Sequence, residues 1–214
     1  MNFTILNDTA RRLDERRGAC ALIAINERSR CKTRLAPVLT TQARLHLVRS
    51  MLAAVLAATG NARTVRQVIV VSPERDCLPA EMAVLADTGK SLNDALTQAL
   101  SVLRDFGCRE VVILPADLPH ITAANIDGLV HAARSGGFAI APDTDGTGTN
   151  ALCLSGAHPF RFQFGADSKR LHLDEAARLG LASKVVRFPG LQFDVDLPAD
   201  LERLEERQWF THQA

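Results

Sequence analysis

Residues 19–59 read ACALIAINERSRCKTRLAPVLTTQARLHLVRSMLAAVLAAT, and this stretch contains the pattern that decides the fold. An apolar run of strand length, residues 19–25, comes first and a polar loop follows it. The segment 40–59 then places apolar side chains on one helical stripe, at Leu45, Val48, Leu52, Val55 and Leu56. A strand followed by a helix that can cover it is the repeating unit of α/β proteins.

The same alternation continues along the chain. Further strands are predicted at residues 68–72, 83–86, 110–114, 138–141, 151–154 and 184–188. Further helices are predicted at residues 92–103 with Ser91 as N-cap, and at 122–134, 167–179 and 198–207. Strands this apolar are typical of a mostly parallel sheet with helices on both faces. We therefore expect a single α/β domain over residues 18–214, preceded by a charged N-terminal extension, residues 1–17.

Composition excludes several classes of protein. The 214 residues are 47% hydrophobic and 23% charged, with a formal net charge of +1, which is typical of a globular domain and argues against a sequence-independent nucleic-acid binder. No apolar run approaches the ~20 residues of a membrane span, and the N-terminus does not resemble a secretory signal, so a cytoplasmic protein is expected. The five cysteines are odd in number and irregularly spaced, which predicts neither a disulfide framework nor a zinc site.

Ligands of open α/β sheets bind at the carboxyl ends of the strands, so the loops after the strands are candidate sites. The loop 26–37 carries four cations, Arg28, Arg30, Lys32 and Arg34. It could hold a polyphosphate, or it could simply be a solvated loop.

Carboxylates follow two other predicted strands. Asp117 lies between Pro115 and Pro119, where it could cap a turn or bind a metal ion. Asp194 and Asp196 lie two residues apart in an extended stretch, so their side chains project from the same face. Neighbouring carboxylates repel each other unless a cation such as Mg²⁺ compensates them, and Asp117 could complete that site.

The segment 143–150, DTDGTGTN, matches part of a dinucleotide fingerprint, because Gly146 to Ala151 reads G-x-G-x-x-A. A strand rather than a helix follows it, which argues against a nicotinamide cofactor. The alternative is a polar turn that holds a small anion. The segment 164–168, FGADS, could form a second anion site at a helix N-terminus, or only a helix cap.

The ordered motifs CKTRLAP (31–37), ILPADLP (113–119), GTGTNAL (146–152), FGADS (164–168) and FDVDLPADL (193–201) resemble the 2-phospho-L-lactate guanylyltransferase family, which includes enzymes that use phosphoenolpyruvate or 3-phosphoglycerate. The resemblance extends from about Ala19 to Leu204. It implies a single Rossmann-like nucleotidyltransferase domain of the glycosyltransferase-A-like type, with a mostly parallel α/β sheet and helices on both faces. It also implies transfer of GMP from GTP to the phosphate of a three-carbon phosphoacid, with release of pyrophosphate, in coenzyme F-420 biosynthesis.

The resemblance also implies roles for individual residues. Lys32 and Asp117 would be catalytic, and Mg²⁺ would be bound by Asp117, Asp194 and Asp196. The nucleotide would contact Asn26, Lys32, Arg34, Asn93, Pro115 and Ala116. The phosphoacid would contact Thr149, Gly165 and Ser168. The family includes dimers, so a homodimer is an open expectation, and the product would pass to a downstream deazaflavin transferase.

Two departures from the family pattern keep alternatives open. The family's first strand usually runs into Pro-x-Lys, whereas Ala24-Ile25-Asn26 stands here, and Ser91 replaces a glycine before Asn93. A non-catalytic nucleotide-binding protein is one alternative. The other is a nucleotidyltransferase of the molybdenum-cofactor or sugar-phosphate type, although such enzymes usually carry a glycine-rich loop after the first strand, and residues 26–34 contain no glycine.

Overall fold

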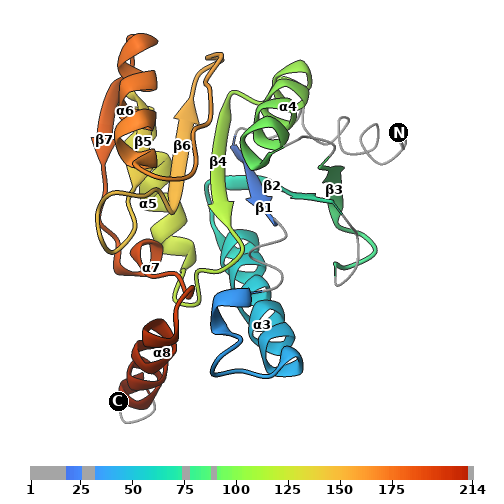
Figure 1. The fold of residues 1–214 in the computed structure, drawn as a ribbon. Coiled ribbons are helices and arrows are strands. Elements are labelled where there is room, and N and C mark those ends of the chain that lie inside the picture. The colour runs from blue at the N-terminus through green and yellow to red at the C-terminus, as the bar shows by residue number, and fades with distance from the viewer. Residues whose placement is uncertain (1–17, 26–31, 74–77, 88–90, 212–214) are drawn as a thin grey trace.

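The computed structural model describes residues 18–25, 32–73, 78–87 and 91–211, with the backbone only at residues 205–211. In this part of the chain, one seven-stranded sheet has the order β3-β2-β1-β4-β6-β5-β7 (Figure 1). Its strands are β1 (Ala19–Ala24), β2 (Val65–Ser72), β3 (Ala83–Ala86), β4 (Glu110–Pro115), β5 (Gly137–Ala141), β6 (Ala151–Ser155) and β7 (Ala182–Val185). β6 runs antiparallel to β4 and β5, whereas the other paired strands are parallel. The predicted mostly parallel sheet is confirmed.

The described helices are η1 (Thr33–Leu35), α3 (Thr41–Asn61), α4 (Leu92–Asp105), α5 (Ala123–Arg134), α6 (Ser168–Arg178), α7 (Pro189–Gln192) and α8 (Pro198–Thr211). Hydroxyl side chains cap three of them, because Thr40, Ser91 and Thr122 each accept a hydrogen bond from a backbone N–H in the first turn. The predicted N-cap at Ser91 is confirmed.

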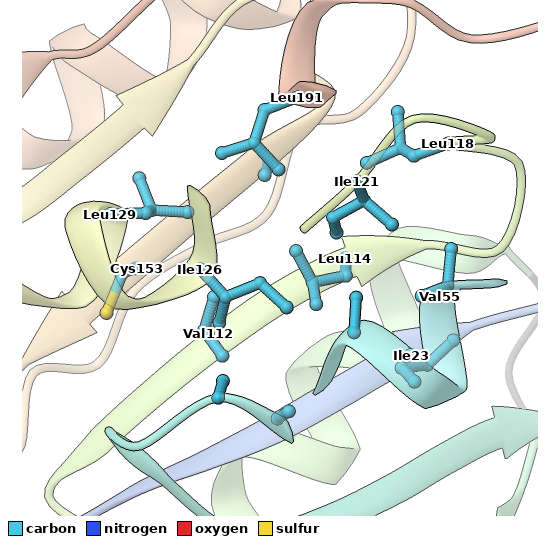
Figure 2. Packing of buried hydrophobic residues seen from close by; sticks show 14 of the residues in the cluster. Ile23, Val55, Val112, Leu114, Leu118, Ile121, Ile126, Leu129, Cys153 and Leu191 are labelled. Atoms are coloured by element: carbon cyan, nitrogen blue, oxygen red, sulfur yellow. The ribbon is translucent and has the colours of Figure 1, made fainter. Parts of the chain in front are cut away.

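The core lies in two layers, one on each face of the sheet. Figure 2 shows one layer, in which Ile23 of β1 and Val112 and Leu114 of β4 pack with Val55 of α3 and Ile126 of α5. The other face of the sheet packs mainly against α4 and α6. Helices therefore cover both faces, as predicted.

The strand order reverses direction between β1 and β4. The chain leaves β1 toward β2 and β3 on one side, then crosses back to place β4 on the other side. Ala24 at the end of β1 pairs with Pro115 at the end of β4, so the loops that follow these strands begin side by side. Such a switch point is the usual ligand site of an open α/β sheet.

A disulfide links Cys20 in β1 to Cys108, which precedes β4, with 6.5 Å between the Cα atoms. Cys153 is a buried free thiol. The sequence, read as having no disulfide framework, did not reveal this pair, because the two cysteines approach each other only when β1 pairs with β4. Cys31 and Cys77 lie outside the described residues.

Two features of the C-terminal part differ from the sequence prediction. β7 covers Ala182–Val185 instead of 184–188, and the short helix α7, which has Pro189 at its start, was not predicted. The predicted extension 1–17 lies outside the described residues. Over the part that the structure does describe, no helix combines the length and apolar character needed to cross a membrane.

Candidate active site

Lys32 lies at the centre of the candidate site, directly before η1. It is 3% exposed, and its Nζ donates hydrogen bonds to Asp117 Oδ2 and Asp196 Oδ1, both at 2.6 Å. Its backbone is left-handed, with φ 40° and ψ 49°, a conformation that costs a non-glycine residue ~1 kcal/mol. Strained backbone of this kind occurs often at functional sites.

Asp117 and Asp196 reach Lys32 from distant parts of the chain. Asp117 is in the loop after β4, where the neighbouring Ala116 and Leu118 are buried and anchor the loop. Asp196 comes after α7, close to the start of α8, and its backbone N–H donates to Asp200 Oδ2 at 3.0 Å. The fold thus brings Asp117 close to the aspartate pair, as the sequence predicted, and Lys32 lies between Asp117 and Asp196.

The segment 193–196 is extended, and its side chains alternate. Phe193 and Val195 are buried in a small cluster with Leu35 of η1 and Met51 of α3, while Asp194 and Asp196 are partly exposed. This alternation agrees with the prediction that both carboxylates project to the same side.

The electrostatics of the site show an excess of negative charge. Burial and the nearby carboxylates of Asp117 and Asp196 raise the pKa of Asp194 to about 6. Asn150 partly opposes this effect, because its Nδ2 donates to Asp194 Oδ1 at 3.3 Å. Burial opposes protonation of Lys32, but Asp117 and Asp196 outweigh it and raise the lysine pKa above its ordinary value. One ammonium thus faces three carboxylates, an arrangement that favours an additional cation.

Two of the three predicted metal ligands, Asp117 and Asp196, contact Lys32. Across residues 18–25, 32–73, 78–87 and 91–211, no group of three His, Cys, Asp or Glu side chains is arranged to hold a metal ion. Lys32 Nζ instead lies between Asp117 and Asp196. The ammonium therefore supplies part of the positive charge that a divalent ion would supply.

The other predicted nucleotide-binding residues divide into three groups. Arg34 is exposed, with its Nη1 at 4.0 Å from Asp196 Oδ2. Pro115 and Ala116 lie at the end of β4, next to the end of β1. Asn26, like Arg28 and Arg30, lies outside the described residues.

Asn93 connects two segments of the site. Its Nδ2 donates to the carbonyl of Phe164 at 3.1 Å, and its Oδ1 accepts from the Phe164 N–H at 2.8 Å. The amide thereby ties the first turn of α4 to the loop 164–168.

The turn 143–150 holds an anion, as the sequence suggested, but the anion belongs to the chain itself. The Asp143 carboxylate accepts backbone hydrogen bonds from Gly146 at 2.7 Å, Thr147 at 3.1 Å and Gly148 at 3.0 Å. A Cβ atom on Gly148 would collide with Asp143 Oδ2, which explains the glycine. The turn is therefore formed before any ligand binds.

The predicted acceptor-binding residues lie around the start of α6. Ser168 is its first residue and is 2% exposed, and its N–H donates to the Gly165 carbonyl at 3.3 Å. Gly165 has φ 131°, and the position of a Cβ atom there is open space. Asp167, the N-cap of α6, has a left-handed backbone and makes no capping hydrogen bond through its side chain. Thr149 lies outside α6, and its Oγ1 is 3.1 Å from Nδ1 of His172, which belongs to this helix.

Three residues near the predicted acceptor site had no role assigned from the sequence: Asp143 and Asn150, which lie in the candidate turn 143–150, and His172. The sequence indicated these residues only through their distance along the chain from predicted site residues or from the glycines of the turn. His172 lies four residues after Ser168, hence on the same helix face. Asn150 lies next to Thr149, and Asp143 lies three residues before the first glycine of the turn.

Comparison with known proteins shows a family match and similar sequences. The model of the family described as guanylyl transferase CofC like matches residues 19–205. A phosphoenolpyruvate guanylyltransferase of Sphaerobacter thermophilus is 39% identical over 188 residues, which cover 86% of this chain and 91% of the relative. The enzyme of the same name from Rubrobacter xylanophilus is 37% identical over 190 residues, covering 86% of this chain and 92% of the relative.

Solved structures with little sequence similarity share the fold. A structure from Desulfovibrio desulfuricans G20, provisionally assigned as a nucleotide-diphospho-sugar transferase, superposes with a TM-score of 0.74 at 19% identity, covering 87% of this chain and 85% of the other. A 4-diphosphocytidyl-2C-methyl-D-erythritol synthase superposes with a TM-score of 0.59 at 12% identity, covering 88% and 98% of the two chains. The fold is that of nucleotidyltransferases.

Proposed function

The chain belongs to the guanylyl transferase CofC-like family, and from this premise we propose that it transfers GMP from GTP to the phosphate of phosphoenolpyruvate, or of a related three-carbon phosphoacid such as 2-phospho-L-lactate or 3-phospho-D-glycerate. The observation that carries the proposal is the position of Lys32 between Asp117 and Asp196 at the switch point of the sheet. The choice of phosphoenolpyruvate follows the names of the relatives that are 34–39% identical.

The reaction needs charge neutralisation more than proton transfer. An acceptor phosphate oxygen attacks the α-phosphorus of GTP, a new P–O bond forms, and the bond to the departing pyrophosphate breaks. The acceptor phosphate is already ionised at neutral pH, so no general base is required. Lys32 and Arg34 would stabilise the negative charge on the pyrophosphate. Lys32 would exchange a carboxylate partner for a phosphate oxygen when GTP binds.

We propose Mg²⁺ as the cofactor, held by Asp117, Asp194 and Asp196. These side chains fit it because they are hard oxygen donors, and because burial and the carboxylates of Asp117 and Asp196 raise the pKa of Asp194 to about 6, which shows that negative charge is crowded at this place. When bound, the ion would neutralise charge on the triphosphate and the acceptor phosphate. Lys32 would then be free to contact the nucleotide.

We place the phosphoacid at Thr149, Gly165 and Ser168. The Thr149 and Ser168 hydroxyls can donate to its carboxylate and phosphate, and the N-terminus of α6 favours negative charge. Gly165 leaves open space where a side chain would intrude. In coenzyme F-420 biosynthesis, the guanylylated product would pass to a deazaflavin transferase.

The proposal is tested by supplying the protein with MgCl₂, one nucleoside triphosphate and one acceptor, and measuring pyrophosphate and the mass of the adduct. GTP, ATP, CTP and UTP are each combined with phosphoenolpyruvate, 2-phospho-L-lactate, 3-phospho-D-glycerate, glucose 1-phosphate and molybdopterin. A GMP adduct of a three-carbon phosphoacid is the expected product. An adduct formed only with a sugar phosphate or molybdopterin would show that the protein belongs to another class of nucleotidyltransferase. The absence of every adduct would support a non-catalytic nucleotide-binding protein.

A further inference from the structure

His172 is a buried histidine beside the proposed acceptor site. It lies in α6, it is 0% exposed, and its ring packs edge-on against Phe164 with 4.8 Å between ring centroids. Phe160 lies on another side of the ring, at 5.8 Å. This packing leaves the ring little freedom to turn.

Both ring nitrogens have a partner, and the partners determine the tautomer. The backbone N–H of Gln163 donates to Nε2 at 2.9 Å, so Nε2 is an acceptor. Burial lowers the pKa of His172 to about 4, so the ring is neutral at pH 7. A neutral imidazole that accepts at Nε2 carries its hydrogen on Nδ1. Nδ1–H therefore donates to Thr149 Oγ1 at 3.1 Å.

This hydrogen bond fixes the direction in which the Thr149 hydroxyl can act. Among the described residues, the bond from His172 is the one that the Thr149 side chain makes. Because Oγ1 accepts from His172, the hydroxyl hydrogen must point elsewhere, and it is available to an approaching acceptor atom. Without the imidazole, the hydroxyl could rotate and present a lone pair, which would repel an anion.

We infer that His172 is a positioning residue of the acceptor site: its Nδ1–H orients the Thr149 hydroxyl so that Thr149 donates its hydrogen to an anionic oxygen of the phosphoacid. The inference rests on the proposed function, which places Thr149 in the acceptor site. Ser168 lies one helical turn before His172 on the same face of α6. This helix therefore supplies Ser168, which would bind the phosphoacid, and His172, which orients Thr149.

The test uses variants that separate hydrogen bonding from packing. His172→Phe keeps an aromatic ring between Phe160 and Phe164 and removes both hydrogen bonds. His172→Asn retains an amide N–H that can replace Nδ1–H. Thr149→Val removes the hydroxyl. Glu175→Gln is the matched control, because Glu175 is also buried on α6 and contacts Arg161 N and Arg178 rather than Thr149.

We expect His172→Phe to raise KM for the phosphoacid about tenfold and to leave KM for GTP unchanged, because a tenfold loss of affinity corresponds to one oriented hydrogen bond. His172→Asn should recover most of this loss. The double variant with Thr149→Val should be no worse than Thr149→Val. Glu175→Gln should lower the melting temperature without changing KM for the phosphoacid. Equal increases of both KM values in His172→Phe, or multiplied effects in the double variant, would overturn the inference.

A second measurement does not depend on turnover. The ¹⁵N chemical shifts of labelled histidines, with His172 assigned by the signals that His172→Phe loses, report which ring nitrogen carries the hydrogen. Hydrogen on Nδ1 agrees with the inference, and hydrogen on Nε2 refutes it. If the wild-type protein forms no adduct, the proposed function fails. Calorimetric titration of phosphoenolpyruvate then replaces KM, and equal affinity of the wild type and His172→Phe would reject the positioning role.

Discussion

Lys32 Nζ lies 2.6 Å from Asp117 Oδ2, although 85 positions separate the two residues in the sequence. They meet because Lys32 follows β1, Asp117 follows β4, and these two parallel strands are paired up to Ala24 and Pro115. A change that shifts β1 along β4 therefore separates the ammonium from the carboxylate. The chemistry of the site depends on the register of this one strand pair.

Lys32→Met removes the positive charge that faces Asp117 and Asp196. We expect guanylyl transfer to fall at least 100-fold. The loss of stability should be ~1–3 kcal/mol, below the usual cost of breaking a fully buried pair, because the Asp196 side chain is 46% exposed. MgCl₂ should raise the melting temperature of the variant more than that of the wild type. Arg34→Met, at a 66% exposed side chain, is the control and should change stability little. Retention of full activity by Lys32→Met would contradict its role.

Asp194→Asn and Asp196→Asn should have opposite effects on stability although both abolish pyrophosphate release. Burial and two neighbouring carboxylates raise the pKa of Asp194 to about 6, so a neutral amide relieves repulsion and should leave the melting temperature unchanged or raised at pH 7. Asp196 accepts a hydrogen bond from Lys32, so Asp196→Asn should lower the melting temperature. Thermal unfolding without divalent ions measures both effects. Equal melting temperatures for the two variants would mean that the three carboxylates do not interact as described.

His172 should make stability depend on pH in acid. Its pKa is about 4 in the folded protein and near the ordinary 6.5 when unfolded, so the unfolded chain binds more protons between these values. Its contribution is fully present above pH 6.5 and is lost as pH falls to about 4, by up to ~3 kcal/mol. Urea unfolding at pH 7, 6 and 5 should show a steeper loss in the wild type than in His172→Phe. Parallel curves would show that the ring is not held neutral.

The Cys20–Cys108 disulfide should stabilise the fold without affecting catalysis. It closes a loop over a sequence separation of 88, which restricts the unfolded chain, so Cys108→Ala should lose ~2–4 kcal/mol. Reductant should lower the melting temperature of the wild type and leave that of Cys108→Ala unchanged. Turnover at 25 °C should be equal, because the bond joins the ends of β1 and β4 opposite to Ala24 and Pro115. Alkylation of both thiols in denatured, unreduced protein would refute the bond.

The alternation of apolar runs and helical stripes was sufficient to predict the layers of the fold, because burial on two faces imposes that pattern on the sequence. The same-side projection of Asp194 and Asp196 was predictable from strand geometry. The short helix α7 was not, since four residues carry no helical period.

The features that the sequence did not reveal are contacts between distant segments. Cys20 and Cys108 become neighbours only through strand pairing, and His172 meets Thr149 only because α6 packs back against the loop before β6. The Asp143 carboxylate accepts hydrogen bonds from the backbone N–H groups of its own turn. The glycines and threonines of this turn had suggested that it holds a separate anion. Local patterns cannot distinguish an internal carboxylate from a ligand that offers the same oxygen atoms.

The last strand, β7, ends at Val185, and the segment with Asp194 and Asp196 follows it. During translation, every strand of the described sheet is therefore synthesised before these two aspartates are added. A premature stop codon between Val185 and Asp194 would yield a polypeptide that carries all seven strands, Lys32 and Asp117, yet lacks two of the three acids. The segment after β7 therefore supplies two of the three carboxylates of the candidate site, and also the buried side chains of Phe193 and Val195 that pack beside them.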